Sequence, residues 1–310
     1  MTAIAVLGST NMDLVAYVPK APRLGETVTG REFRTVPGGK GANQAVAAAR
    51  AGGEVRMIGA VGADDFGVRL RAALGAAGVD TAALRTVEGA SGTAHITVDD
   101  EGGNSIVVVP GANGRLTSLE DGDEARIAAA DTLLLQLEVP LGVVTAAARA
   151  ARAHGVRTVL TPAPAQPLPP ELLAATDLLV PNEHEAAALT GLTDARQAAE
   201  ALLQQVPAVA VTLGAAGVLC AARGRAPLTV PAPRVRAVDT TAAGDTFVGA
   251  LAVALGEGRA VREAVSWACA AAALSVQRPG AQDSMPARAE IDAFAYAEYA
   301  EQTGTSGSAS

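Results

Sequence analysis

The chain has 310 residues, of which 49% are hydrophobic and 18% are charged, and its formal net charge is −8. This composition is typical of a compact globular protein, and a negative charge without any basic cluster excludes nucleic acid as an expected partner. No apolar run is long enough to cross a bilayer, and the first residues lack a signal-peptide pattern, so we expect a cytoplasmic protein with no membrane partner. Cys220 and Cys269 stand outside any metal-binding spacing and are expected to be buried free thiols.

Short apolar runs alternate with longer Ala- and Leu-rich segments of helical period. In chain order, buried strands are expected at residues 3–9, 54–62, 132–138, 157–163, 177–182 and 208–214. Helices are expected at residues 68–78, 141–155, 195–206 and 261–276. This alternation predicts the α/β class, a three-layer α/β/α sandwich with a mostly parallel central sheet, in a single domain over residues 1–310. The ligands of such sheets gather at the carboxyl ends of the strands.

Two segments, residues 14–36 and 91–110, break this rhythm because polar and apolar positions alternate in them. Such alternation is typical of half-exposed antiparallel strands. The segments therefore predict a small β-sheet lid that covers a site or pairs with a second subunit, although ordinary surface hairpins fit the same pattern. The final residues, 301–310, are typical of a flexible tail.

Several common catalytic motifs are absent. Lys40 lies in VPGGKGANQ, but Gly41 follows it where a Walker A loop requires Ser or Thr. No GxGxxG opens a helix after the first expected strand, which excludes the nicotinamide-type fingerprint. The histidines are scattered, and His184 is expected on a helix surface rather than as a ligand or a base.

The segment DTTAAGDTF, residues 239–247, has residue types that suit phosphoryl transfer. The small side chains of Ala242, Ala243 and Gly244 leave room for backbone N–H groups at a helix N-terminus to surround a phosphoryl group. Asp245 would then orient an acceptor hydroxyl and take its proton. The alternative is that Asp245 is only the N-cap of an apolar helix.

Three further segments place polar or small residues directly after expected strands. Asn182 and Glu185 open a helix, where they would hold hydrated Mg²⁺ beside phosphates or only complement the helix dipole. The turn within VTLGAAGVL, residues 211–219, either lets a nucleotide approach the backbone or only joins two strands. Asn11 and Asp13 follow the first strand, where a carboxylate can accept hydrogen bonds from sugar hydroxyls.

Together these segments resemble the ribokinase-like (PfkB) carbohydrate kinase family. The similarity covers residues 4–294 and is carried by the paired signatures GGKGANQAVAAARAG and DTTAAGDTF, with VLGSTNMD, LLLQLEVP, PNEHEAAALTG, VTLGAAGVL and RPGAQDSMP in the family's order. The resemblance implies a central α/β sandwich with a β lid that often forms a dimer clasp, and hence a homodimer. It implies ATP-dependent phosphorylation of D-ribose at the 5-hydroxyl. The alternatives are a kinase of the same family for deoxyribose, another sugar or a nucleoside, and a non-catalytic sugar or nucleotide sensor.

The resemblance also implies site residues at matching positions. Asp245 matches the catalytic base, and Ala243 and Gly244 belong to the anion hole. The sugar-binding positions are Asn11, Asp13, Gly39, Lys40, Gly41, Ala42, Asn43 and Glu138. The nucleotide-binding positions are Asn182, Thr212, Leu213, Gly214, Ala215, Ala216, Gly217, Gly244 and Cys269, the last in place of the usual His or Asn. Glu185 lies in the motif associated with Mg²⁺, and an activating K⁺ would be held, partly through backbone carbonyls, by Asp239, Thr241, Ser275, Arg278, Gly280 and Ser284.

Overall fold

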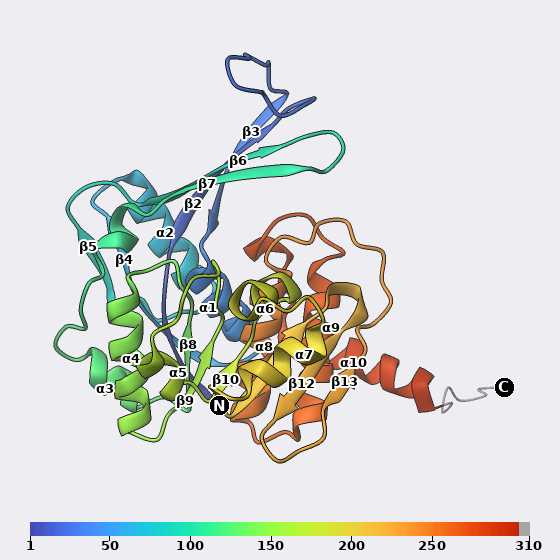
Figure 1. Cartoon of the computed structure of the whole chain (residues 1–310). Coiled ribbons are helices and arrows are strands. Elements are labelled where there is room, and N and C mark those ends of the chain that lie inside the picture. The colour runs from blue at the N-terminus through green and yellow to red at the C-terminus, as the bar shows by residue number, and fades with distance from the viewer. Residues whose placement is uncertain (304–310) are drawn as a thin grey trace.

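The computed structural model describes residues 1–303, and within them a nine-stranded sheet forms the centre of the molecule (Figure 1). Across the sheet the strands are, in order, β13 (Leu228–Val230), β12 (Val218–Ala222), β11 (Ala208–Thr212), β10 (Leu178–Leu179), β9 (Arg157–Leu160), β8 (Thr132–Leu135), β1 (Ala3–Leu7), β4 (Glu54–Gly62) and β5 (Leu84–Val87). All neighbouring strands from β11 to β5 are parallel, whereas β12 is antiparallel to both of its neighbours. The expected mostly parallel sheet is therefore confirmed.

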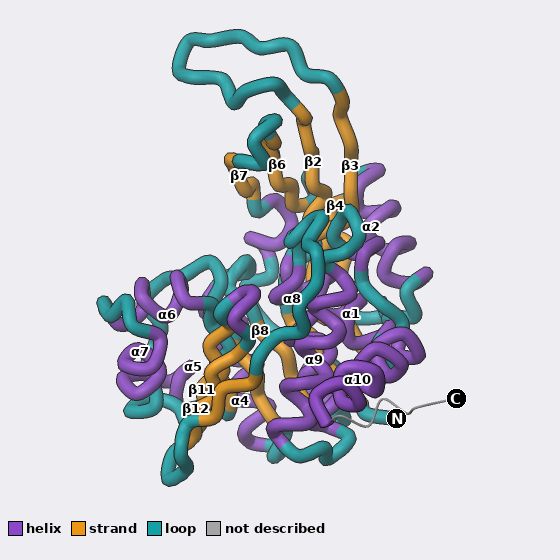
Figure 2. Tube along the Cα trace, turned by 90° about the vertical axis from the view of Figure 1, so that its right-hand side faces the viewer, coloured by secondary structure: helices purple, strands orange, loops and turns teal. Residues whose placement is uncertain are grey.

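Helices cover both faces of this sheet (Figure 2). One face carries α1 (Lys40–Arg50), α2 (Asp65–Ala76), α8 (Ala243–Gly256), α9 (Val261–Ser275) and α10 (Arg288–Thr303). The other face carries α3 (Asp123–Ala128), α4 (Leu141–Ala153), α5 (Pro170–Ala174), α6 (Glu183–Thr190) and α7 (Ala195–Leu202). Three short 3₁₀ turns complete the chain: η1 (Gly111–Arg115), η2 (Gly214–Ala216) and η3 (Gln282–Ser284). The three-layer sandwich is thus confirmed.

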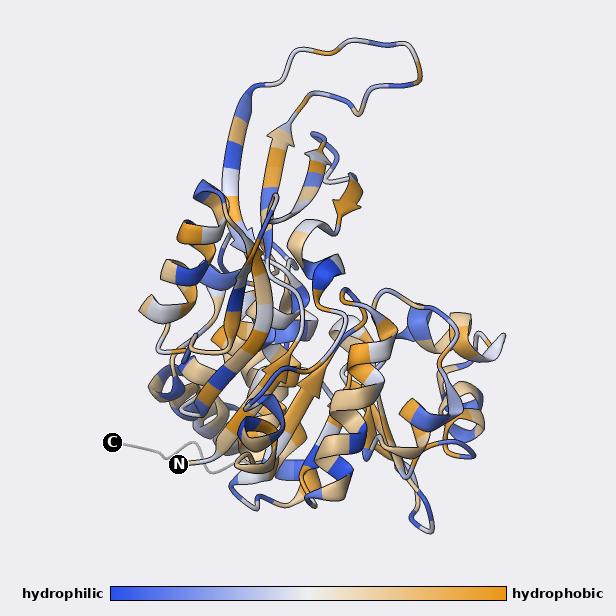
Figure 3. Cartoon of the chain, turned by 90° about the vertical axis from the view of Figure 1, so that its left-hand side faces the viewer, coloured by the Kyte–Doolittle hydropathy of each residue, from blue (hydrophilic) through white to orange (hydrophobic). Residues whose placement is uncertain are grey.

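The strands are continuously apolar because each face of the sheet packs against helices. In β1, Ile4 and Val6 belong to one hydrophobic cluster and Ala5 and Leu7 to the other, and all four side chains are fully buried. Figure 3 shows the strands of the central sheet mostly in the hydrophobic colour. This continuous burial explains why short runs without alternation predicted strands.

A second sheet of four strands, which we call the lid, projects from the core (Figure 1). Its order is β3 (Glu32–Gly38), β2 (Asn11–Tyr17), β6 (Gly92–Val98) and β7 (Asn104–Val109). The hairpins β2–β3 and β6–β7 are antiparallel, but β2 and β6 pair in parallel, a pairing that alternation alone did not predict. The separate small sheet is confirmed, but the expected bounds 14–36 were wrong in part, because β2 begins at Asn11 and residues 18–31 form a loop outside any strand.

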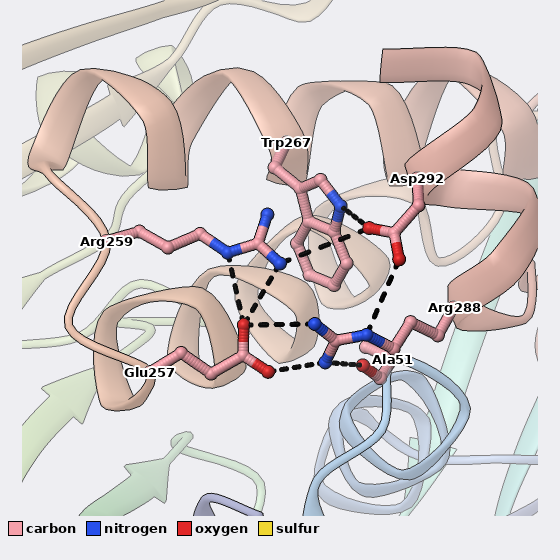
Figure 4. A network of polar contacts seen from close by, with 6 residues as sticks. All are labelled: Ala51, Glu257, Arg259, Trp267, Arg288 and Asp292. Atoms are coloured by element: carbon pink, nitrogen blue, oxygen red, sulfur yellow. Dashed lines mark hydrogen bonds and ion pairs between the residues drawn. The ribbon is translucent and has the colours of Figure 1, made fainter. Parts of the chain in front are cut away.

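The last helix, α10, is fastened to the core by a network of charged side chains around Trp267 (Figure 4). The indole nitrogen of Trp267 donates to Asp292 at 2.8 Å, and the guanidinium carbon of Arg259 lies 4.4 Å from the centre of the Trp267 ring. Arg288 pairs with both Asp292 and Glu257, and hydrogen bonding to Arg288 lowers the pKa of Glu257. These contacts tie α10 to α8 and α9.

Both cysteines are buried free thiols, as expected. Burial raises the pKa of Cys220 to about 11 and that of Cys269 to about 12, so neither thiol is an activated nucleophile. No helix within residues 1–303 is long and apolar enough to span a membrane. Of the expected tail, residues 301–303 end α10 and residues 304–310 lie outside the described chain.

Candidate active site

The floor of the site is formed where the N-terminus of α1 lies directly on the end of β1. A Cβ atom built on Gly41 would lie 2.6 Å from the backbone nitrogen of Ser9 and 2.8 Å from the Cα of Gly8. Gly39, the N-cap residue, has φ = 91°, a value that favours glycine, and its Cβ would lie 2.7 Å from the nitrogen of Asn11. The glycines of GGKGAN are therefore required because the backbone at the start of α1 approaches the backbone after β1 too closely for a side chain.

The polar side chains assigned to the sugar meet above this floor. Glu138, which follows β8, accepts hydrogen bonds from the Ser9 hydroxyl at 2.6 Å and from the backbone nitrogen of Lys40 at 3.0 Å, both at Oε2. Asn11 begins β2, and its Oδ1 accepts from Asn113 at 2.7 Å. Asn113 was missed because GANGR reads only as a turn, yet it is buried and fixes the orientation of the Asn11 amide.

Asp245 lies in the first turn of α8, and only 8% of the residue is exposed. Its Oδ2 accepts a hydrogen bond from Asn43 Nδ2 at 3.1 Å, and its Oδ1 accepts one from Gln44 Nε2 at 3.0 Å. The N-cap of α8 is Ala242, with no side-chain capping bond, so the alternative of Asp245 as an N-cap is wrong. The carboxylate faces α1 instead, and Gln44 is a partner that the sequence did not reveal.

Four charged groups face one another across the site. Burial, followed by repulsion from Glu138 and Asp245, raises the pKa of Asp13 from 3.8 to about 7, against the attraction of Lys40. Burial also raises the pKa of Asp245, although Lys40 and the two amide donors oppose the change. For Lys40, burial would lower the pKa, but the surrounding carboxylates, led by Asp245, outweigh it and the pKa is raised. Lys40 is therefore a buried cation among three carboxyl groups, and its positive charge offsets part of their mutual repulsion.

The N-terminus of α8 offers backbone N–H groups to an anion. Ala242 is the one non-glycine residue with positive φ among residues 1–303, at φ = 57°. The amide of Ala243 donates to Thr240 at 3.2 Å, whereas those of Gly244 and Asp245 donate to no acceptor within the described chain. A Cβ on Gly244 would meet nothing within 4 Å, so the space beside these amides is open. A strained residue that turns free amides toward open space is typical of an anion site.

A cavity of about 390 Å³ adjoins this helix terminus. Six of the residues assigned to the nucleotide line it: Thr212, Gly214, Ala215, Gly217, Gly244 and Cys269. Three do not, namely Asn182, Leu213 and Ala216. The sequence missed the irregular segment 232–237, of which most residues line the cavity, and the apolar side chains of Phe247 and Val276. An apolar slot ending at free amides suits a planar base joined to phosphates.

Comparison with known proteins identifies the family to which these features belong. The family model described as pfkB family carbohydrate kinase matches residues 1–288. The chain belongs to the pfkB family of carbohydrate kinases. A ribokinase of Haemophilus influenzae is 44% identical over 299 residues, covering 94% of this chain and 97% of that protein, and a ribokinase of Bacillus subtilis is 45% identical over 300 residues, covering 94% and 99%.

Solved structures of pfkB-type kinases share the fold. A ribokinase of Arabidopsis thaliana complexed with ribose and ATP superposes with a TM-score of 0.90 at 35% identity, covering 95% of this chain and 99% of that one. The ribokinase of Thermotoga maritima gives a TM-score of 0.87 at 39% identity, with the same coverage. The resemblance inferred from the motifs is confirmed.

Within this pfkB kinase, Asp239 joins the two segments to which the cation residues were assigned. Its Oδ1 accepts from the backbone nitrogen and the hydroxyl of Thr241, at 2.9 and 2.6 Å, and its Oδ2 accepts from the nitrogen of Gly280 at 2.8 Å. The segment that leads into α8 is thus tied to the segment that follows α9. Of the residues predicted for the cation, the structure thus brings Asp239, Thr241 and Gly280 into contact.

The oxygen atoms available to a cation there are mainly backbone carbonyls. The carbonyls of Asp239, Arg278 and Gly280 accept no backbone hydrogen bond within the described chain. The hydroxyls of Ser275 and Ser284 donate to carbonyls of their own turns, which leaves their oxygen lone pairs available. No cluster of three or more His, Cys, Asp or Glu side chains that could hold a metal occurs in residues 1–303. Such carbonyl-rich surroundings fit a weakly hydrated monovalent cation.

Asn182 and Glu185 form a capping box at the start of α6. Asn182 Oδ1 accepts from the nitrogen of Glu185 at 2.7 Å, and Glu185 Oε2 accepts from the nitrogen of Asn182 at 2.8 Å. Burial raises the pKa of Glu185, whereas the positive charge of Lys40 acts to lower it. Since Oε2 is used by the cap, Oε1 is the oxygen left for a ligand, which fits a hydrated Mg²⁺ held through water. His184, beside them, is 90% exposed at its side chain, as expected for a helix surface.

Proposed function

We propose that this chain transfers the γ-phosphoryl group of ATP to the 5-hydroxyl of D-ribose, giving ribose 5-phosphate and ADP. Membership of the pfkB family and the similarity to ribokinases, one of them solved with ribose and ATP, support the reaction. ATP occupies the cavity beside the N-terminus of α8, and the enzyme works where ATP is available, in the cytoplasm. The sugar lies on the floor formed by α1, under the lid.

Asp245 is the general base in this proposal. As the 5-hydroxyl attacks the γ-phosphorus, its proton passes to a carboxylate oxygen of Asp245 and the bond to the ADP oxygen breaks. The free amides of Gly244 and Asp245 bind the phosphoryl oxygens, on which negative charge is concentrated. Asn11, Asp13 and Glu138 hold the other sugar hydroxyls. The observation that carries the proposal is the buried carboxylate of Asp245, which accepts hydrogen bonds from two side-chain amides. It lies directly beside backbone N–H groups at the N-terminus of α8 that have no acceptor within the described chain.

The proposed base is tested by replacing Asp245 with Asn. We expect the fold and ribose binding to remain while turnover falls by about 10²–10⁴-fold, the usual contribution of a positioned base. Asp123→Asn is a matched control, because Asp123 is also buried but its carboxylate pairs with Arg85, which is not among the site residues. ADP release with ribose is the readout. Near-normal turnover in Asp245→Asn would exclude this residue as the base.

The sugar is tested by steady-state rates on ribose, deoxyribose, fructose and nucleosides. A site that bonds a hydroxyl rejects the analogue that lacks it, by factors of about 10⁴ or more. We therefore expect ribose to have the largest kcat/KM. A clear preference for a nucleoside would refute the assignment to ribose, and ADP release that does not depend on any sugar would favour a sensor.

Two cations complete the proposed reaction. A hydrated Mg²⁺ near Glu185 would neutralise phosphate oxygens, and K⁺ would be held by the carbonyls of Asp239, Arg278 and Gly280, with Thr241, Ser275 and Ser284 around them. The cation would fix the two segments that Asp239 joins and so support the amides of α8. We expect K⁺ to raise the rate more than Na⁺ does. An unchanged rate without K⁺ would count against this site.

A homodimer through the lid is also proposed. β7 is an edge strand of the lid, and four consecutive apolar side chains on it are exposed: Ile106 at 53%, Val107 at 64%, Val108 at 46% and Val109 at 46%. An edge strand with this composition favours pairing with another sheet. Changing Ile106 and Val108 together to Lys should convert a dimer to a monomer in sedimentation experiments. A wild-type monomer at micromolar concentration would refute the clasp.

A further inference from the structure

Four carboxamide side chains, from three parts of the fold, surround Asp245. Asn43 and Gln44 lie on α1 and donate to the two carboxylate oxygens. Gln136, directly after β8, donates through Nε2 to Gln44 Oε1 at 2.6 Å. Gln282, in η3, donates through Nε2 to Asn43 Oδ1 at 3.2 Å. Each amide that contacts Asp245 is therefore itself contacted, at its oxygen end, by a second amide.

This arrangement favours the donor end of each amide facing Asp245, and Gln44 Nε2 also donates to Thr161 Oγ1 at 3.2 Å. A carboxamide has a donor end and an acceptor end of similar size, and an ionised carboxylate only accepts. If Gln44 rotated by half a turn, its oxygen would face the carboxylate and its nitrogen would face the donor of Gln136. The same two mismatches would arise between Asn43, Gln282 and the carboxylate. Because Gln136 and Gln282 present their donor ends in this structure, they disfavour the orientation that would repel a charged base.

We propose that Gln136 and Gln282 are positioning residues, which act through Gln44 and Asn43 to keep amide donors directed at both oxygens of Asp245. The proposal rests on the proposed function, in which Asp245 must be ionised to accept the hydroxyl proton. The polar contacts of both glutamine amides are with Gln44 and Asn43 and not with Asp245 itself, so their proposed effect on the base passes through the amides that they orient.

The surroundings of both glutamines fit this role. Gln136 is fully buried, and a Cβ on Gly8 would lie 2.0 Å from its Oε1, so the glycine at position 8 leaves the room that this side chain occupies. The Oε1 atom has no hydrogen-bond partner within residues 1–303, so the bond to Gln44 is the one polar contact described for this side chain. Gln282 is held from outside the site, because Arg50 Nη1 donates to its carbonyl at 2.8 Å and to that of Met285 at 2.7 Å. The polar contact described for the Gln282 amide is with Asn43.

The charge on Asp245 links this arrangement to pH. Burial raises its pKa, while Lys40 and the hydrogen bonds from Gln44 and Asn43 lower it, and Glu138 raises it slightly. Asp13 is the other charged group that interacts with Asp245. Loss of an orienting glutamine leaves all three charged neighbours in place but lets one amide turn its oxygen to the base. The pKa of Asp245 then rises, and a higher pH is needed to ionise it.

The test measures kcat against pH, from about 5.5 to 9.5, for the wild type, Gln136→Met and Gln282→Met, with ribose, ATP, Mg²⁺ and K⁺ saturating. Methionine keeps the volume of glutamine and removes the amide. We expect the acidic limb to move to higher pH by about half to one unit in each variant, so that kcat falls about three- to tenfold below the limb and recovers at alkaline pH. The KM for ribose should stay within about twofold in Gln136→Met, because Gln44 is not among the sugar-binding positions, whereas it can change in Gln282→Met, because Asn43 is one of them.

Two further variants separate positioning from packing. Gln166→Met is the control, since the Gln166 amide donates at 3.4 Å to the carbonyl of Leu137, next to Gln136 in the chain, and not to the amides around Asp245. Gln282→Glu should shift the limb more than Gln282→Met, because an ionised Glu at 282 favours the reversed orientation of Asn43. Should Gln136→Met not fold, the two variants at 282 decide the matter alone.

The outcomes also separate this inference from the proposed function. If Asp245→Asn is inactive but the acidic limb is the same in wild type, Gln136→Met and Gln282→Met, the positioning role is refuted and the base assignment stands. If the variants at 136 and 282 lower kcat equally at every pH, the glutamines act only through packing, and the inference fails in the same way. If Asp245→Asn turns over normally, the function itself is wrong.

Discussion

Replacing Asp13 with Asn is expected to stabilise the ligand-free protein, and more at alkaline than at acidic pH. Burial, then Glu138 and Asp245, raise the pKa of Asp13 in the folded protein from 3.8 to about 7. Because the folded state has the higher pKa, it binds the proton more tightly than the unfolded chain does. The stability contributed by this proton is complete below the unfolded value of 3.8 and is lost as the pH rises through about 7. Ionised Asp13 therefore destabilises the empty site.

The size of the effect follows from the shift. A pKa change from 3.8 to about 7 is about three units, and each unit corresponds to about 1.4 kcal/mol, so full ionisation lowers the free energy of unfolding by about 4 kcal/mol. At pH about 5 more than a third of this loss is already present, since an unfolded carboxyl is ionised there. Between pH about 5 and about 8.5, the advantage of the variant over the wild type should grow by about 2–3 kcal/mol.

Urea unfolding of both proteins at these two pH values measures the difference. Other groups titrate in both proteins, so most of their contribution cancels when the two curves are compared. Asp194→Asn controls for the substitution itself, because Asp194 is a helix N-cap, where Asn serves equally well. An advantage of Asp13→Asn that stays the same at both pH values would refute the idea that the empty site raises the pKa of Asp13. The variant should also lose ribose affinity, since it lacks the carboxylate.

Three further substitutions test other parts of the structure. Gly244→Ala should keep or slightly raise stability, because the added Cβ meets nothing within 4 Å. Its kcat/KM for ATP should fall about a hundredfold, because the methyl group crowds the anion site. A normal kcat/KM would place the phosphate elsewhere. Ala242→Val should lower the unfolding free energy by about 1–2 kcal/mol in urea, because φ = 57° suits a β-branched residue badly; unchanged stability would contradict the strain. Arg288→Met should lower it by about 1 kcal/mol, less at high salt, through loss of its pairs with Glu257 and Asp292; full stability at low salt would show that these pairs contribute nothing.

The sequence predicted the elements whose side chains are buried on both faces and those that are half-exposed. The run AIAVL of β1 is almost entirely buried, whereas β3 and β6 of the lid are only partly buried, so the sheet and the lid followed from the pattern. Asp245 could be singled out because the small residues before it leave room for backbone N–H groups to bind a phosphoryl group. The glycines of GGKGAN could be quoted as a motif, but the need for them became clear only in the contact between Gly41 and Ser9.

The partners of the site residues could not be predicted, because they are brought in from distant parts of the chain. Gln136 follows a strand like any other residue, and Gln282 lies in a short turn, so nothing in their local pattern marks them. Asn113 contacts Asn11 across 102 positions of sequence. The cavity wall at 232–237 has no regular structure and therefore no period to read. Hydrogen bonds between segments that are far apart in the chain produce no local pattern that a single sequence could reveal.

The proposed sugar site is divided between the core and the lid, and this division has a thermodynamic consequence. Asn11 and Asp13 belong to β2, a lid strand, whereas Lys40, Glu138 and Asp245 belong to the core. Because Gly41 and Gly8 leave no space between α1 and the sheet, the core half of the site is closely packed, and we expect any opening to come from the lid. A sugar that touches both halves therefore bridges them. If the sugar binds as proposed, we expect sugar affinity and lid position to be reciprocally linked, so that a contact that favours the closed lid, including one from a second subunit, also tightens sugar binding.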